Sequence, residues 1–231
     1  MKKNFDFKSF KIGPITPSEY LNRATVRGVI YMTLAILLFL CGVIVYGIIL
    51  NLREIPLSEA LKQKGFSELK NPNIVIDRIS FTLDLYEDSV LVKTYRASFG
   101  RTLHKAKNRA GDGATPVGRY QVCSIDTLYK YYKFLRLNYP SLDDAMDALR
   151  KGLISQKEFN NIKFEYYYEG CTGYNLVLGG NIGIHGIGKF NYVLKNLPFV
   201  FNWTDGSIAL SDEDIEEIYS VIKIGTEVII K

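Results

Sequence analysis

The chain has 231 residues, of which 47% are hydrophobic, and its formal net charge is +5 at pH 7. This length is enough for one large domain or two small ones with a buried core, and the apolar content excludes a disordered chain. A mean hydropathy of +0.01 excludes a protein with many membrane spans. A basic balance of this size fits nucleic acid, an anionic surface or a membrane-topology signal, so the position of the charges decides.

An uncharged apolar segment covers residues 29–50, in which only Thr33, Gly42 and Gly47 fall outside the hydrophobic class. A helix of that length is about 33 Å long, slightly more than the roughly 30 Å thickness of a hydrocarbon core. A buried core helix rarely runs so long without a polar face, and a signal peptide would have a shorter apolar region and a small-residue cleavage site. The segment therefore predicts a single retained transmembrane helix.

The charges divide at this segment. Residues 1–28 hold six Lys or Arg against two acidic residues, whereas residues 51–231 hold 23 against 22. Because basic residues favour the cytoplasmic side of a span, the basic tail at 1–28 predicts a cytoplasmic N-terminus. The expected location is the inner (cytoplasmic) membrane, with the large C-terminal part on the periplasmic side. That part is nearly neutral, so nucleic acid is not an expected partner.

The exported part is expected to begin with a juxtamembrane stalk at 51–73, followed by one domain over 74–231. Residues 73–100 alternate apolar and polar side chains and predict two strands around a turn at 87–89. Further strands are expected at the end of the glycine-rich stretch 111–122, at the glycine-broken segment 176–186 and at 227–230. A short helical stretch is expected at 57–65 within the stalk, and three further helices are expected with N-caps at Ser141, Ser155 and Ser211. The expected fold class is mainly β with inserted helices.

Three cysteines are present, and Cys41 lies in the predicted span. Cys123 and Cys171 lie in the exported part, where they either form a disulfide bond or are buried as free thiols. The sequence leaves both alternatives open.

Of the two histidines, His185 is the stronger catalytic candidate, because it ends an apolar strand and is followed by Gly186. His104 lies in a basic loop and is expected to be solvated. A polar turn at 204–207 ends in Ser207, and a hydroxyl group held at a turn near an imidazole suits a base-assisted nucleophile. Backbone N–H groups of such a turn suit an oxyanion. The alternatives are that His185 has a purely structural role and that residues 204–207 form an ordinary polar turn.

The sequence also resembles a known family, in the blocks GDGATPVGRYQV, LNYP, IGIHG and WTDGSIAL, followed by DIEEIY and GTEVII. Together these blocks resemble the L,D-transpeptidase (YkuD-type) catalytic domain, most closely the YafK-like murein branch. The resemblance covers residues 74–231 and implies a YkuD-like β-sandwich or barrel and acyl transfer on peptidoglycan stem peptides. Some relatives hydrolyse or make a link between peptidoglycan and a lipoprotein, so a cell-wall-linked lipoprotein is a further expected partner.

The resemblance also assigns roles to individual residues. His185 matches the general base, and Gly186 matches the neighbour that orients the imidazole through its backbone. The turn before the nucleophile, with its substrate or oxyanion contacts, is matched by Thr204, Asp205 and Gly206. Ser207 stands where the family has its cysteine.

The serine at position 207 departs from the family in the atom that does the chemistry. An alcohol has no accessible anion at neutral pH, so Ser207 needs His185 to remove its proton in the transition state, and a heavy loss of rate is expected. Three explanations stay open: an artificial replacement, a natural serine enzyme such as a hydrolase, and an inactive cell-wall binding module.

No cofactor is expected, and no metal either, since the sequence has no His/Cys/Asp cluster at ligand spacing. Asp112 is expected to be a turn residue. The basic stretch 101–109 suits substrate carboxylates, or it is simply solvated. The tyrosines at 129–132 and 166–168 suit glycan or peptide surfaces and half-buried elements alike.

Overall fold

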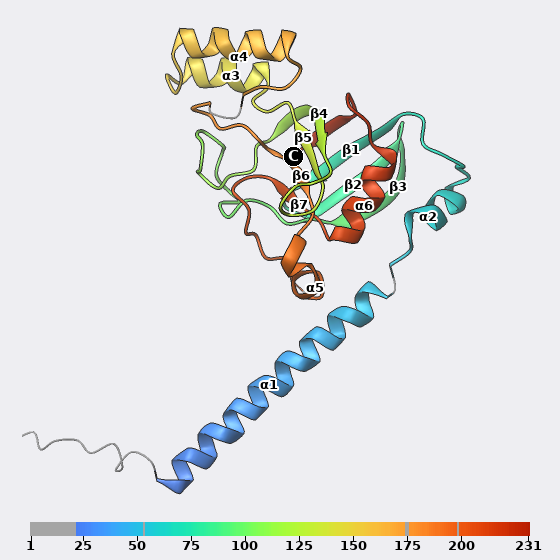
Figure 1. Cartoon of the computed structure of the whole chain (residues 1–231), viewed down its shortest axis with the longest axis vertical. Helices are drawn as coiled ribbons and strands as arrows, with labels where there is room; N and C mark the ends of the chain where they lie inside the picture. Colours follow the sequence, from blue (N-terminus) through green and yellow to red (C-terminus); the bar gives the residue numbers. More distant parts are fainter. Residues whose placement is uncertain (1–21, 53, 174–175, 198) are drawn as a thin grey trace, which may run out of the picture. The chain divides into compact units, whose positions relative to one another are not determined.

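The computed structural model describes residues 22–52, 54–173, 176–197 and 199–231. The chain divides into a unit of residues 1–45 and a unit of residues 46–231. Most of the predicted basic tail lies outside the described residues. The predicted span lies in helix α1 (Arg23–Asn51), which is long and apolar enough to cross a membrane and is almost entirely unburied (Figure 1). Length and composition suit a retained span and a signal sequence alike.

The second unit contains one eight-stranded mixed sheet in the order β3-β2-β1-β8-β4-β5-β6-β7 (Figure 1). The pairs β1–β8 and β6–β7 are parallel, and the other neighbouring pairs are antiparallel. The strands are β1 (Pro72–Asp77), β2 (Thr82–Glu87), β3 (Val90–Arg96), β4 (Gly118–Asp126), β5 (Phe134–Leu137), β6 (Gly183–His185), β7 (Ile208–Ala209) and β8 (Glu227–Ile230). The last strand of the chain therefore pairs in the middle of the sheet.

The two edges of this sheet approach each other just beyond β3. Ser98 and Ala209 exchange two backbone hydrogen bonds of 2.8 Å, which join the residues after β3 to the far edge strand β7. Gly100 and Thr204 form a second bridge nearby. The sheet therefore curls into a half-barrel, and the predicted fold class, mainly β with inserted helices, is confirmed.

Alternating side chains build the core of the half-barrel. In β1 and β2 every second residue is fully buried, including Ile74, Ile76 and Leu83, as expected when successive side chains point to opposite faces of a strand. Helix α6 (Asp212–Val221) adds Ile215 and Ile218 to the same core. Burying each of these side chains contributes about 1.5–3 kcal/mol to folding.

The short helical stretch predicted within the stalk at 51–73 is present, and part of this segment packs on the domain. It contains helix α2 (Leu57–Lys64), and Leu57 belongs to the core with 5% of its surface exposed. The Leu57 N–H donates to Glu217 Oε1 at 2.9 Å. Apolar side chains that pack against the same core are Leu61, Phe66 and Leu69. A few apolar side chains are thus enough to pack this otherwise polar segment against the core of the domain.

A helical hairpin, α3 (Leu142–Arg150) and α4 (Gln156–Tyr168), is inserted between β5 and β6 (Figure 1). Both helices begin with the predicted capping boxes, Ser141 with Asp144 and Ser155 with Glu158. The hairpin has a small core of its own. A disulfide bond between Cys123 and Cys171 ties its far end to β4. Of the two alternatives for these cysteines, the structure has the bonded one.

Two stretches differ from the predicted elements. Residues 73–100 form three strands rather than two, because Asp77 Oδ1 accepts from the N–H groups of Ile79 and Ser80, each at 2.9 Å, and closes an extra turn. The glycine-broken segment 176–186 forms a strand only at Gly183–His185. Short helices η3 (Gly188–Phe190) and α5 (Asn191–Leu194) follow it, and the sequence patterns did not predict them.

Candidate active site

The candidate site lies where β6 and β7 run side by side. These strands are parallel, with Ile184 opposite Ile208 and His185 opposite Ala209. Because strand side chains alternate with a period of two, His185 and Ser207 share one face of the sheet. Both line a cleft of about 590 Å³. The pairing register therefore brings the two predicted catalytic residues to one cleft.

His185 is buried, with 2% of its surface exposed. Burial lowers the pKa of its imidazole to about 4, so the ring is neutral at pH 7. Its Nδ1 lies 2.6 Å from the Gly186 carbonyl oxygen. Since a carbonyl oxygen only accepts, Nδ1 carries the proton and Nε2 keeps its lone pair. The ring is thus held in the tautomer that a general base requires.

Aromatic rings surround this imidazole. The Tyr131 ring stacks on it at 5.4 Å between centroids, and the Trp203 ring meets it edge-on at 5.7 Å. Tyr129 and Phe134 complete the surround, at 5.8 Å and 6.2 Å. These rings exclude water and account for the desolvation of His185. The cluster of tyrosines at 129–132 was the only signal of this environment in the sequence, and nothing there connected it to His185.

The turn at 204–207 is held by the Thr204 side chain, which is 4% exposed. Its Oγ1 donates to the Ser207 carbonyl oxygen at 2.6 Å and accepts from the Gly206 N–H at 3.2 Å. Gly206 has φ +125°, and a Cβ there would lie 2.5 Å from the Ala114 carbonyl oxygen. Only glycine therefore fits this position. The Gly206 N–H is already engaged, whereas no described residue accepts from the Ser207 N–H.

Ser207 is half-buried at the end of this turn. Its Oγ accepts a hydrogen bond from the Gly183 N–H at 3.3 Å. Among the described residues, no hydrogen bond joins Ser207 Oγ to the His185 ring. The nucleophile position and the base thus share the cleft but are not hydrogen-bonded to each other.

Asp212 holds the chain that follows His185, a role the sequence did not reveal. Its Oδ1 accepts from the backbone N–H groups of Ile187 and Gly188 at 2.8 Å and 2.9 Å. A Cβ at Gly186 would lie 2.5 Å from the same oxygen. In the sequence Asp212 resembles any acidic residue in the first turn of a helix, so its contact with the His185 loop could not be predicted.

Charged groups stand at the rim of the cleft. Asp205 is exposed and forms an ion pair with Arg101. Lys107 also lines the cleft and pairs with Asp112 at 2.9 Å. Burial alone would raise the pKa of Asp112, but hydrogen bonds from backbone N–H groups and Lys107 lower it to about 2. Asp112 thus organises a turn, while His104 is exposed away from the cleft lining.

No other side chain replaces the missing thiol. Cys171 is bonded to Cys123, and Cys41 lies in α1. Among the described residues, no group of three or more His, Cys, Asp or Glu side chains is arranged to hold a metal ion. The cleft thus presents the hydroxyl group of Ser207 and the imidazole of His185, the two groups that the sequence predicts to be catalytic.

A neutral imidazole and a hydroxyl group that face one cleft are the parts of a base-assisted nucleophilic site. They are set here in a half-barrel with inserted helices. The family model of the L,D-transpeptidase catalytic domain (YkuD) matches residues 71–230. The chain belongs to this family.

Solved structures of similar fold include an L,D-transpeptidase from Xylanimonas cellulosilytica DSM 15894, with 16% identity, 77% of this chain and 70% of that chain covered, and a TM-score of 0.42. A mutant form of the helical cell shape determining protein from Campylobacter jejuni is similar, with 19% identity and a TM-score of 0.45. The match covers 76% of this chain and 54% of that chain. An L,D-transpeptidase from Mycobacterium tuberculosis H37Rv shows 18% identity, 69% and 58% covered, and a TM-score of 0.40. The chain thus spans little more than half the length of the latter two. No match was found among curated proteins.

Proposed function

We propose that this chain is a membrane-anchored protein of cell-wall biogenesis that binds peptidoglycan stem peptides and transfers their acyl group through position 207, with His185 as the base. The observation that carries the proposal is the shared cleft, which His185 and Ser207 enter from neighbouring parallel strands. Membership of the L,D-transpeptidase family supplies the substrate class.

In the proposed reaction, Ser207 Oγ bonds to the carbonyl carbon before a terminal D-residue while its proton passes to His185 Nε2. The negative charge that develops on the carbonyl oxygen is received by the Ser207 N–H, which has no acceptor among the described residues. The C–N bond then breaks, and the proton on Nε2 goes to the leaving amine. An amine or water then attacks the acyl carbon while His185 Nε2 takes its proton, and this proton passes to Ser207 Oγ as the ester C–O bond breaks.

The rim charges suit this substrate class. Stem peptides carry carboxylates, and Arg101 and Lys130 line the cleft, whereas the Lys107 side chain is buried and paired with Asp112. Arg101 is exposed and its partner Asp205 is exposed too, so this ion pair costs little to open. We propose that Arg101 exchanges Asp205 for a substrate carboxylate.

The proposed location is the inner membrane, with the N-terminus in the cytoplasm and the domain in the periplasm. Helix α1 suits a membrane span by length and composition. The Cys123–Cys171 disulfide supports an oxidising compartment for the domain. A lipoprotein linked to the cell wall is a further proposed partner, on the resemblance to the YafK-like branch.

A second candidate function is a hydrolytic or inactive cell-wall binding module. The observation that favours it is Ser207 itself, whose Oγ is hydrogen-bonded to the Gly183 N–H and not to the base. In this case the cleft binds stem peptides and the rate of acyl transfer is negligible.

Cross-linking and cleavage of purified peptidoglycan, measured for the chain as given and for Ser207→Cys, test both functions. Turnover by Ser207→Cys that is lost in the added variant His185→Gln supports the first proposal. If neither form turns over peptidoglycan, the proposal that the chain is an enzyme is wrong. Binding to insoluble peptidoglycan without turnover in either form supports the binding module instead.

A further inference from the structure

We propose that the segment of residues 188–201 lies in the lipid–water interface of the membrane and forms a second contact with the bilayer beside the anchor. The inference rests on the proposed retention of residues 29–50 as a membrane span. It concerns a surface outside the cleft, and its occupant is the lipid headgroup and upper acyl region. We call residues 188–201, of which all but position 198 are described, the interfacial segment.

The interfacial segment exposes several large apolar side chains within a short stretch of the chain. Phe190 and Tyr192 are 68% and 67% exposed. The other large apolar side chains that it exposes are Val193, Phe199 and Phe201. Exposed apolar side chains that gather on one surface can mark an interaction site. Aromatic side chains are the ones enriched at membrane interfaces.

The charges of the segment fit the same environment. Its only charged residues are Lys189 and Lys195, both basic. Long basic side chains can extend toward lipid headgroups while their stems cover apolar surface. Glu54 and Glu213 lie near the segment, so aromatic and apolar burial, rather than net charge, supplies most of the attraction.

Polar contacts hold the segment against the domain. Asn191 Nδ2 donates to Glu213 Oε2 at 2.9 Å, and Lys195 forms an ion pair with the same carboxylate. The Arg96 guanidinium donates to the Leu197 carbonyl oxygen at 2.6 Å. These contacts hold the segment against α6 and β3.

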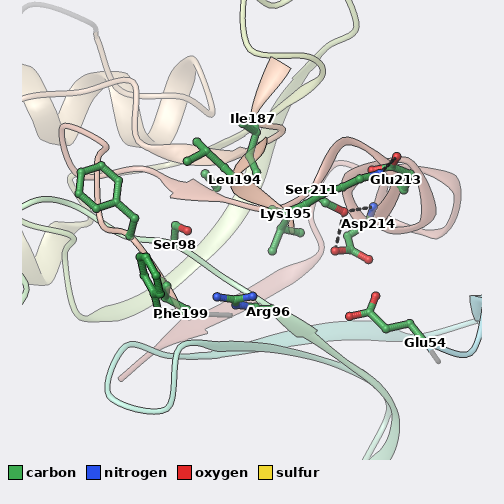
Figure 2. Close-up of a pocket in the computed structure, with 14 residues that line it drawn as sticks. Glu54, Arg96, Ser98, Ile187, Leu194, Lys195, Phe199, Ser211, Glu213 and Asp214 are labelled. Atoms are coloured by element: carbon green, nitrogen blue, oxygen red, sulfur yellow. Dashed lines mark hydrogen bonds and ion pairs between the residues drawn. The ribbon is translucent and has the colours of Figure 1, made fainter. Parts of the chain in front are cut away.

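The chain itself brings this face to the membrane. Helix α1 ends at Asn51, and Glu54 already lines a cavity together with Phe199 and Phe201, as Figure 2 shows for Glu54 and Phe199. Three residues span at most about 11 Å. The chain is then fixed to the domain by buried Leu57. Only a short stretch of chain therefore separates the end of α1 from a residue that lines a cavity with the interfacial segment.

The contact bears on the cleft because of where the segment lies in the sequence. It joins His185, at the end of β6, to the turn at 204–207 that carries the nucleophile position. A segment seated in the interface therefore fixes the height and orientation of the cleft above the membrane, where stem peptides of the nearest peptidoglycan lie.

Fluorescence quenching in lipid nanodiscs tests the inference on the full chain. A single tryptophan is placed in the segment by Tyr192→Trp, and a matched control by Tyr168→Trp, an exposed tyrosine at the end of α4 that is 77% exposed. Both variants carry Trp203→Phe to remove the native tryptophan. We expect lipids brominated near the headgroup to quench Tyr192→Trp, with a blue-shifted emission and protection from iodide, and to leave Tyr168→Trp unquenched.

The outcomes separate this inference from the proposed function. Equal behaviour of the two variants overturns the inference. Protection from iodide without quenching by brominated lipid also overturns it, in favour of a second copy or a protein partner. Loss of the chain from the carbonate-washed membrane fraction removes its premise and overturns it as well. Turnover of peptidoglycan by Ser207→Cys, measured with native Trp203, succeeds or fails independently of the quenching.

Discussion

Replacing Ser207 with cysteine is expected to raise the rate of acyl transfer by about four orders of magnitude at pH 7. A thiol has a pKa of about 8.5, whereas an alcohol ionises about as weakly as water, with a pKa of about 15.7, so the thiol's anion is roughly seven decades more available. The anion of the weaker acid is the better nucleophile, with a Brønsted coefficient of about 0.4–0.5. The alkoxide is therefore intrinsically about three decades more reactive than the thiolate. The net advantage of sulfur is therefore about 10⁴.

The structure limits what else this substitution changes. The hydrogen bond from the Gly183 N–H to Ser207 Oγ, at 3.3 Å, can also reach a sulfur atom, which accepts over longer distances. The base is unaltered, because Nδ1 of His185 stays bonded to the Gly186 carbonyl oxygen. The substitution thus exchanges the reacting atom and keeps its surroundings.

The measurement is single-turnover acylation by a peptide with an L-centre before a terminal D-residue, followed by intact-protein mass spectrometry. The chain as given, Ser207→Cys and Ser207→Ala are compared at pH 7, and the alanine variant sets the background. An acylation rate of the cysteine form within tenfold of the serine form would refute the reasoning. Equal rates for Ser207→Cys with and without His185→Gln would show that His185 is not the base.

Substitutions at three further positions test the packing around the site and in helix α6. Gly186→Ala would place a Cβ 2.5 Å from Asp212 Oδ1 and 2.8 Å from the Tyr131 carbonyl oxygen. We therefore expect the turnover of Ser207→Cys to vanish. Overpacking should also lower the free energy of unfolding by about 1–3 kcal/mol, measured as a fall in the thermal midpoint. Thr204→Val leaves the Gly206 N–H and the Ser207 carbonyl oxygen unpaired and should cost about 1–3 kcal/mol in denaturant unfolding, whereas Thr204→Ser should stay close to the parent. Burial raises the pKa of Asp214 to about 6 from 3.8. Because this folded-state pKa lies above the unfolded one, protonation of Asp214 stabilises the folded chain. Its contribution to the free energy of unfolding, about 3 kcal/mol, is complete below pH 3.8 and is lost as the pH rises through 6. Asp214→Asn should therefore be more stable than the parent at pH 7.5 but not at pH 4, and equal differences at both pH values would contradict the assignment.

Local signals in the sequence predicted most of what is local in the structure. The capping boxes at Ser141 and Ser155 are confirmed because each depends on one side chain and a backbone three residues away. The strand ending at His185 was predicted too long, since the glycines before it serve close packing. A Cβ at Gly183 would lie 2.5 Å from the Leu135 carbonyl oxygen. The sequence shows the glycine but not the neighbour that requires it.

What the sequence could not predict depends on contacts between distant residues. The closing strand at 227–230 was predicted, but its place between β1 and β4 was not, because pairing partners more than 100 residues apart leave no local pattern. The docking of Leu57 against the core was likewise concealed in a polar segment. The same reason applies to the site, where Tyr131 and Trp203 reach His185 from separate loops. Their effect on the pKa of His185 exists only in the folded chain.

The burial of His185 also decides how well each nucleophile suits this site. A general base works best when its pKa lies near the working pH, and an imidazole with a pKa of about 4 is a weak base at neutral pH. A thiol, which loses its proton far more readily than an alcohol, tolerates a weak base, whereas the alcohol needs a strong one. The aromatic rings that desolvate the imidazole thus penalise serine more than cysteine at position 207. For the proposed acyl transfer, the surroundings of His185 therefore predict a slow reaction with serine at position 207 and a faster one in the Ser207→Cys form.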